Sequence, residues 1–178
     1  MRSSTPLTVE VLISLMALLE INHKLAYKPS HFLKKSFGDF STNKEKYYRA
    51  LYSAFRYKYL KKRLIQNVAY IEVTRKGKYK ALKYILKGRK SKKWDGKWRL
   101  LIFDVPENKS YLRQRLRENL ELIGFKYLQK SVWITPYDIR KELGVIIDYL
   151  DAHSFVHFML IDTLEDDSWL RKKFRISS

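Results

Sequence analysis

Residues 97–136 constrain the fold of this chain more than any other part of its sequence. The segment contains the apolar run 98–103, which predicts a buried strand that stops at Asp104. We expect Asn108 to cap the next helix, whose apolar residues recur at helical spacing until Gly124, a typical helix stop. Two short apolar runs then predict a pair of return strands. This order predicts one compact unit that mixes helix and sheet.

The residues after this segment complete a recognisable order of elements. Apolar residues at helical spacing predict a helix over 137–150, and the apolar, aromatic run 154–162 predicts a last strand. The complete order is strand, helix, strand, strand, helix, strand, which is that of a ferredoxin-like βαββαβ sandwich. We therefore expect an α+β chain with a ferredoxin-like domain over residues 94–178.

Positive charge is concentrated in the first half of the chain. Residues 1–93 contain 23 lysines and arginines against 5 acidic residues, whereas residues 94–178 contain 14 against 13. A strongly basic surface attracts polyanions, because binding releases the counterions that surround a nucleic acid. The asymmetry predicts a basic N-terminal module that binds nucleic acid and a nearly neutral second module.

Composition also indicates the domain boundary and the class of protein. The basic, non-periodic run 88–93 predicts a linker between a module over 1–87 and a module over 94–178. The chain has no cysteine, which excludes disulfides, thiolate metal sites and cysteine nucleophiles. It shows neither a signal-peptide pattern nor an apolar run near the roughly 18 residues of a membrane span, so we expect a cytoplasmic protein without a membrane partner.

The first module is expected to begin with three helices. Residues 8–21 have apolar positions at helical spacing, and a short second helix is expected from Ser30 to just before Gly38. The Thr-Asn-Lys-Glu pattern at 42–45 is a capping box, so a third helix should begin there and run to about Tyr59. One side of this helix is aromatic and should pack on the first helix, while the other side is basic.

A β-hairpin is expected directly after the third helix. Residues 60–66 and 69–73 have strand-like composition around a turn at Asn67. Three helices followed by a hairpin is the order of a winged helix-turn-helix, in which helix 43–59 would enter the major groove of DNA. The predicted DNA-binding residues are Lys44, Lys46, Arg49, Ser53 and Arg56 on that helix, and Lys61, Lys62, Arg63 and Asn67 on the hairpin.

Longer motifs in the second module resemble those of a known family. The runs W-D-G-K-W-R at 94–99 and I-F-D-V-P-E at 102–107 resemble the central domain of the PaaX family of transcriptional repressors, and residues 128–136 continue the match. That central domain is similar to the small ferredoxin-like nuclease subunit of the CRISPR spacer-acquisition complex. The resemblance implies a winged-helix DNA-binding protein with a ferredoxin-like dimerisation domain.

The resemblance also raises alternatives. In the CRISPR nuclease subunits, one strand-end aspartate from each protomer holds a divalent metal, and Asp104 has the corresponding place here. Two facing carboxylates could bind Mg²⁺ or Mn²⁺ and position water for phosphodiester cleavage, although Asp104 could simply cap the turn before Pro106. A metal-dependent endonuclease and a non-catalytic adaptor that binds a CRISPR integrase subunit are therefore alternatives. Another is a scaffold that binds a protein through residues 169–174.

These observations favour a sequence-specific regulator of transcription. We expect a repressor that binds double-stranded DNA as a homodimer, because two recognition helices can then face two half-sites. The second module is expected to form the dimer. This function requires no cofactor and no catalytic residue.

Overall fold

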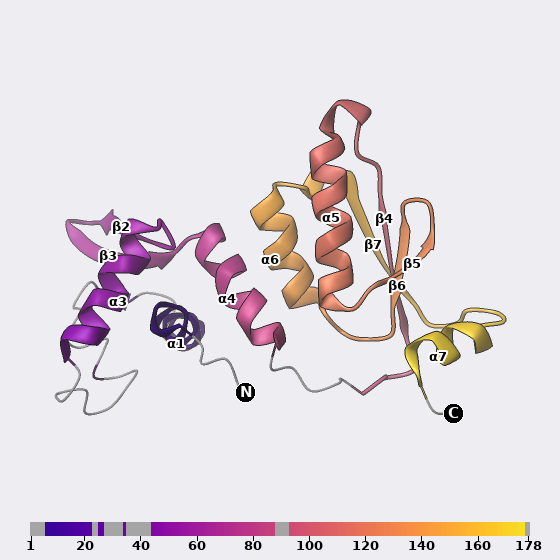
Figure 1. Ribbon diagram of the computed structural model, residues 1–178, viewed down its shortest axis with the longest axis horizontal. Coiled ribbons are helices and arrows are strands. Elements are labelled where there is room, and N and C mark those ends of the chain that lie inside the picture. The colour runs from indigo at the N-terminus through magenta and orange to yellow at the C-terminus, as the bar shows by residue number, and fades with distance from the viewer. Residues whose placement is uncertain (1–5, 23–24, 27–33, 35–43, 88–92, 177–178) are drawn as a thin grey trace. The chain divides into compact units, whose positions relative to one another are not determined.

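Helices and strands are mixed along the whole chain, as the sequence predicts. The structure, a computed structural model, describes residues 6–22, 25–26, 34, 44–87 and 93–176 (Figure 1). The chain divides into two units, Met1–Gly88 and Arg89–Ser178, which are called here the first unit and the second unit. None of the helices in the described ranges has the length and apolarity that a membrane span needs.

The described part of the first unit combines helices with a small antiparallel sheet. Its helices are α1 (Leu7–Asn22), α3 (Lys44–Arg56) and α4 (Arg75–Lys87), and its strands are β1 (Leu25–Ala26), β2 (Leu60–Ile65) and β3 (Val68–Val73). The strand order is β1-β3-β2, which places β2 at an edge of the sheet. Of the expected second helix, from Ser30 to just before Gly38, only residue 34 is described, and it is helical; Thr42 of the capping box lies outside the described residues.

The core of the first unit lies between α1 and α3. Leu12 and Leu15 from α1 are buried in one cluster with Leu51 and Ala54 from α3. Burial of a leucine side chain contributes roughly 1.5–3 kcal/mol to the free energy of unfolding. Phe55 packs at the margin of this cluster. The apolar side of α3 therefore packs on the first helix, as predicted.

Helix α3 ends at Arg56, before the predicted end at Tyr59. Lys58 has a left-handed backbone with a φ angle of 58°. Its amide donates to the carbonyl of Phe55 (2.9 Å), and the Tyr59 amide donates to the carbonyl of Ala54 (2.8 Å). These two hydrogen bonds form the Schellman pattern that closes a helix. The predicted end was wrong because glycine is the usual signal for this motif, and a lysine occupies the position here.

A two-residue turn joins β2 to β3. Gln66 and Asn67 have positive φ angles of 48° and 61°, the geometry of a type I′ turn, whose twist suits paired antiparallel strands. The register places Lys61 opposite Glu72. The predicted hairpin and its turn at Asn67 are confirmed.

Helix α4 begins close to the end of α3. The Thr74 hydroxyl donates to the carbonyl of Lys58 (2.8 Å) and accepts a hydrogen bond from the Gly77 amide (3.1 Å), so Thr74 caps the helix. A Cβ atom added at Gly77 would collide with the carbonyl oxygen of Tyr59. The approach of α4 to this carbonyl therefore requires glycine at position 77.

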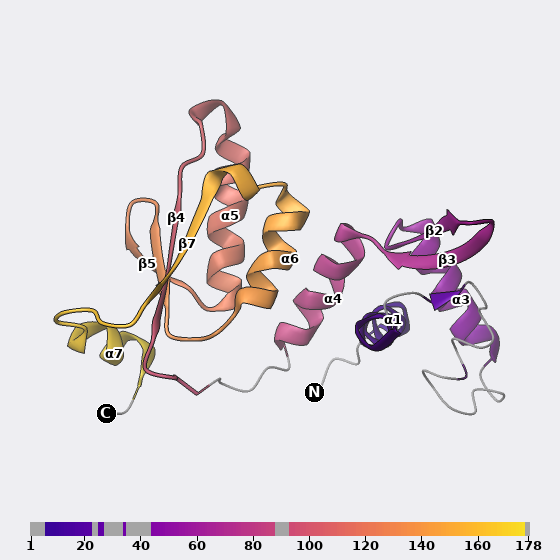
Figure 2. The ribbon, with the colours of Figure 1, turned by 180° about the vertical axis from the view of Figure 1, so that it is seen from behind.

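The second unit has a four-stranded antiparallel sheet in the order β5-β6-β4-β7, which is the ferredoxin-like arrangement. Its strands are β4 (Trp98–Phe103), β5 (Lys126–Gln129), β6 (Val132–Thr135) and β7 (Val156–Ile161). Its helices are α5 (Ser110–Ile123), α6 (Arg140–Leu150) and α7 (Ser168–Phe174). Helices α5 and α6 lie side by side against the sheet (Figure 1). Seen from behind, α7 lies across the sheet from them (Figure 2).

Three element boundaries in the second unit differ from the predicted ones. Asn108 does not cap α5, because it lies within a 3-10 turn (Glu107–Lys109) and the helix begins at Ser110 without a side-chain cap. Helix α6 begins at Arg140 rather than at residue 137, after Asp138 accepts a hydrogen bond from the Arg140 amide (3.3 Å). A second 3-10 turn occupies His153–Phe155, so β7 begins at Val156 rather than at residue 154. The predicted stop of α5 at Gly124 is confirmed, with a φ angle of 101°.

Helix α7 has no counterpart among the predicted elements. Leu170 from this helix is buried with Trp98 and Ile134 from the sheet. Asp167, directly before the helix, accepts hydrogen bonds from the Trp98 indole (2.9 Å) and from Arg171 Nε (2.7 Å). The helix therefore covers one part of the sheet face that α5 and α6 leave open.

The W-D-G-K-W-R motif forms a network around a buried arginine. Arg99 is 3% exposed and pairs through both terminal nitrogens with the Asp95 carboxylate. It also donates to the carbonyls of Lys97 (2.7 Å) and Pro136 (2.9 Å). The hydrogen bond from Arg99 lowers the pKa of Asp95 to about 2. This motif therefore joins the start of β4 to the end of β6.

Replacing Asp95 by asparagine should destabilise the second unit at neutral pH. The variant leaves Arg99 buried without its counter-charge, which should cost about 1–3 kcal/mol. Because folding lowers the pKa of Asp95, its contribution is present above about pH 4 and declines as the pH falls toward 2. Urea unfolding at several pH values should therefore show the difference between the two proteins shrinking in acid.

The matched control for this measurement is Asp162→Asn. Asp162 forms an exposed ion pair with Lys97 (2.7 Å), so its loss should change the free energy of unfolding by less than about 1 kcal/mol. A difference between Asp95→Asn and the unchanged protein that stays constant from neutral to acidic pH would contradict the assigned role of the Asp95 carboxylate.

Alanine at position 77 should destabilise the first unit. The added methyl group collides with the Tyr59 carbonyl, and such overpacking costs about 1–3 kcal/mol. The control is Gly144→Ala in α6, where a Cβ meets nothing within 4 Å and should stabilise the helix by about 0.5–1 kcal/mol. Calorimetry of the full chain measures the change in stability for both variants. A Gly77→Ala protein as stable as the unchanged protein would show that α4 can move away without cost.

Candidate nucleic-acid interface

Helix α3 separates buried apolar residues from exposed basic ones. Ala50, Leu51 and Ala54 are buried. Of the predicted DNA-binding residues on this helix, Lys44, Lys46, Arg49 and Arg56 are exposed and Ser53 is half-buried. Lys46, Arg49, Ser53 and Arg56 follow one another at spacings of three and four, so they share one side of the helix. The packing of α3 on α1 thus leaves a basic surface free to meet a polyanion.

Exposed tyrosines accompany these basic residues and were not among the predicted contacts. Tyr52 is 57% exposed, and its ring lies 6.4 Å from that of Tyr48. Tyr57 is 50% exposed, with the Arg56 guanidinium 5.5 Å above its ring. Aromatic rings beside cations can pack on sugars or bases. Tyr52 could have been predicted as a contact from the sequence, because it lies three residues after Arg49 and four before Arg56 and so shares their side of the helix.

Two of the cations on the β2–β3 hairpin are paired with an acidic side chain. Lys61 and Arg63 both lie near the Glu72 carboxylate, at 3.1 Å and 3.7 Å. These two predicted contact residues therefore belong to an ion-pair cluster on β2 and β3, although all three side chains remain partly exposed. Lys62 and Asn67 are exposed, the latter at the turn. Glu72 reduces the net positive charge of the hairpin, an effect that the sequence analysis missed.

Helix α4 carries a row of lysines that the sequence analysis did not assign to the site. Lys76, Lys80, Lys83 and Lys87 recur at spacings of four, three and four, and are called here the α4 lysine stripe. Each lysine lies above a tyrosine ring, at 4.9–5.6 Å from its centre. Residues 75–87 include no acidic side chain. The 3–4 spacing of lysines alone would have revealed this stripe.

Asp104, the candidate metal ligand, is exposed directly after β4. Its amide donates to the carbonyl of Phe155 (2.9 Å), which fixes the backbone at this point. In the described ranges, no group of three histidine, aspartate or glutamate side chains lies close enough to hold a metal ion. Asp104 is therefore not part of such a group among the described residues.

Comparison with known proteins identifies the second unit. Residues 91–169 match the family model of the PaaX protein central Cas2-like domain. The match spans the buried Arg99 network and all four strands of the β5-β6-β4-β7 sheet. No curated protein matches the chain. The second unit is thus a central Cas2-like domain of the PaaX type.

Proposed function

We propose that this chain is a DNA-binding regulator of transcription that acts as a repressor and a homodimer. The observation that carries the proposal is the exposed basic side of α3, which lies opposite the residues that bury the helix against α1. A helix held in this way can enter a major groove without losing its packing. The PaaX-type second unit supports the same conclusion, because PaaX-like proteins are regulators.

The proposal divides the contacts between two kinds of residue. Lys46 and Arg49, exposed on α3, would reach the edges of bases, while Lys62 and Asn67 on the hairpin would contact phosphates or the minor groove. The α4 lysine stripe would add phosphate contacts. Phosphate contacts supply most of the affinity and base contacts supply the sequence preference.

The homodimer would form through the second unit. β7 is at an edge of its sheet, and it exposes two apolar side chains, Met159 at 39% and Leu160 at 49%. An edge strand with exposed apolar residues is suited to association with a second copy. A dimer would place two first units on one DNA molecule, with residues 88–93 as the linkers.

Loss of the basic side of α3 should weaken DNA binding. We expect Lys46→Ala/Arg49→Ala to bind its site more weakly at about 0.15 M salt, and the slope of log affinity against log salt to fall by about 0.9 for each phosphate that the variant no longer neutralises. Fluorescence anisotropy with labelled duplexes measures both quantities. The control, Lys126→Ala/Lys141→Ala, removes the same charge from exposed positions of the second unit. Equal effects of the two double variants would contradict a specific role for α3.

Selection from random duplex DNA should enrich an inverted repeat. A symmetric dimer with two recognition helices reads two half-sites in opposite orientation. The selection is done in EDTA, at about 0.15 M salt and with excess competitor DNA, because basic proteins bind any duplex at low salt. Binding without an enriched sequence would contradict the repressor and favour an adaptor that holds nucleic acid without reading it.

A further inference from the structure

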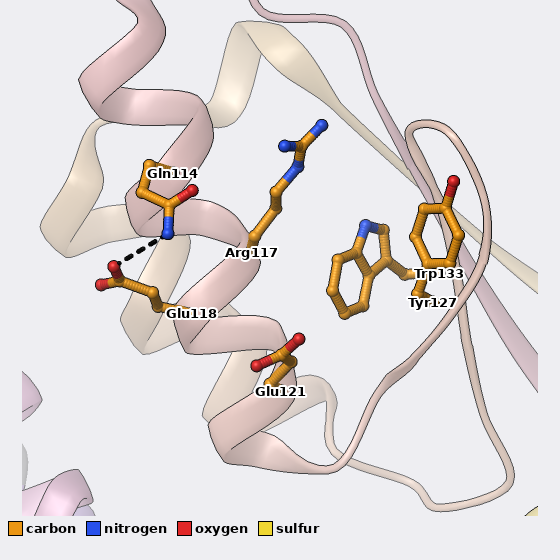
Figure 3. Close-up of a pocket in the computed structure, with 6 residues that line it drawn as sticks. All are labelled: Gln114, Arg117, Glu118, Glu121, Tyr127 and Trp133. Carbon is orange, nitrogen blue, oxygen red and sulfur yellow. Dashed lines mark hydrogen bonds between the residues drawn. The ribbon is translucent and has the colours of Figure 1, made fainter.

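A pocket of about 420 Å³ lies between α5 and the β5–β6 hairpin of the second unit (Figure 3). Its volume is within the range of small-molecule sites. The side chains that line it are Gln114, Arg117, Glu118 and Glu121 from α5, Tyr127 from β5 and Trp133 from β6. The four α5 residues recur at spacings of three, one and three, so one side of the helix faces the hairpin.

Trp133 provides an unused hydrogen-bond donor at this pocket. The residue is 3% exposed, and its indole Nε1 is buried without an acceptor in the described structure. A buried indole N–H normally has a partner. The ring is held in place by the edge-to-face contact with Tyr127, whose ring centre lies 5.8 Å away. In Figure 3 the indole nitrogen lies on the side of the ring nearer to Arg117.

Two opposite charges at the pocket are also unused. Arg117 and Glu121 lie one helical turn apart, yet neither side chain has a hydrogen bond or ion pair with another described residue. Glu118 differs, because it accepts a hydrogen bond from Gln114 (3.1 Å) and pairs with Arg115 (3.6 Å). The pocket therefore offers one free cation, one free carboxylate and one free N–H donor among the residues that the structure describes.

We propose that this pocket binds a free α-amino acid. The carboxylate of the ligand would accept hydrogen bonds from the Arg117 guanidinium and the Trp133 N–H, and its ammonium group would pair with Glu121. Arg117 is long enough to turn toward the indole nitrogen, and it is the residue best suited to hold a carboxylate. The apolar part of the ligand would lie against the rings of Tyr127 and Trp133.

The charges of the pocket favour a zwitterion over a simple anion. Phosphate or a phosphodiester would be drawn to Arg117, but it would be repelled by Glu118 and Glu121. A cation alone would leave the Trp133 donor without an acceptor. A ligand whose ammonium and carboxylate groups are both attached to one carbon satisfies all three groups at once. The proposal does not depend on DNA binding, since every residue it uses belongs to the second unit.

The test follows the indole N–H signals of the ¹⁵N-labelled full chain by nuclear magnetic resonance. Trp133→Phe assigns the Trp133 signal, and the probes are the twenty common L-amino acids, first pooled and then single. At least one amino acid should shift the Trp133 signal in a saturable way. Its N-acetyl and carboxamide derivatives, which each lack one charge, should bind at least about tenfold more weakly. No shift with any amino acid would overturn the proposal.

Three variants separate a specific site from general weak binding. Arg117→Met and Glu121→Gln should each abolish the saturable shift, while Glu165→Gln, an exposed carboxylate outside the pocket, should leave it unchanged. These are surface substitutions, and the remaining indole signals report whether the fold is retained. Equal binding of an amino acid and of its N-acetyl and carboxamide derivatives, which each lack one charge, would overturn the proposal. A Trp133 signal that shifts only with protein concentration would also overturn it, because a second copy would then cover the pocket.

Discussion

The buried guanidinium of Arg99 is the interaction on which the second unit depends. An unpaired cation at 3% exposure would be costly, so Asp95 and the carbonyl of Pro136 must stay in place around it. The neighbouring residue in the motif, Trp98, extends the network through Asp167 to α7. The W-D-G-K-W-R motif therefore has a structural role. It joins the start of β4 to Pro136, after β6, and to Asp167, before α7.

The two units use their charges differently. In the second unit several ions are paired with one another, such as the exposed Asp138 with Arg140 and the partly buried Asp167 with Arg171. In the first unit the cations of α3 and α4 lie on exposed helix surfaces, many beside tyrosine rings. Exposed cations that are not paired with acidic side chains are available to a ligand. The net charge of the chain is thus carried almost entirely by residues 1–93, which hold 23 lysines and arginines against 5 acidic residues.

The strands and helices of the βαββαβ order could be predicted from the sequence, but α7, the ends of several elements and the pocket could not. Apolar periodicity reports which side of an element is buried, and this predicted β4, α5 and the α3 packing side. It could not predict the left-handed Lys58, which lacks the glycine signal, nor α7, whose preceding Asp167 bonds Trp98 instead of capping the helix. The basic residues of α3 and the hairpin were predicted as contacts from their charge, from helical spacing and from the order of three helices and a hairpin. The pairing of Glu72 with Lys61 and the pocket at Trp133 depend on tertiary contacts.

The position of β4 within its sheet has a consequence for synthesis of the chain. β4 pairs with β6 on one side and with β7 on the other, and both partners follow it in sequence. The first unit ends at Gly88, so its folding does not have to wait for these partners. Domains generally fold from the N-terminus as they leave the ribosome. The apolar strand 98–103 therefore emerges with both edges unpaired, and until β6 and β7 follow it has the character of an aggregation-prone segment.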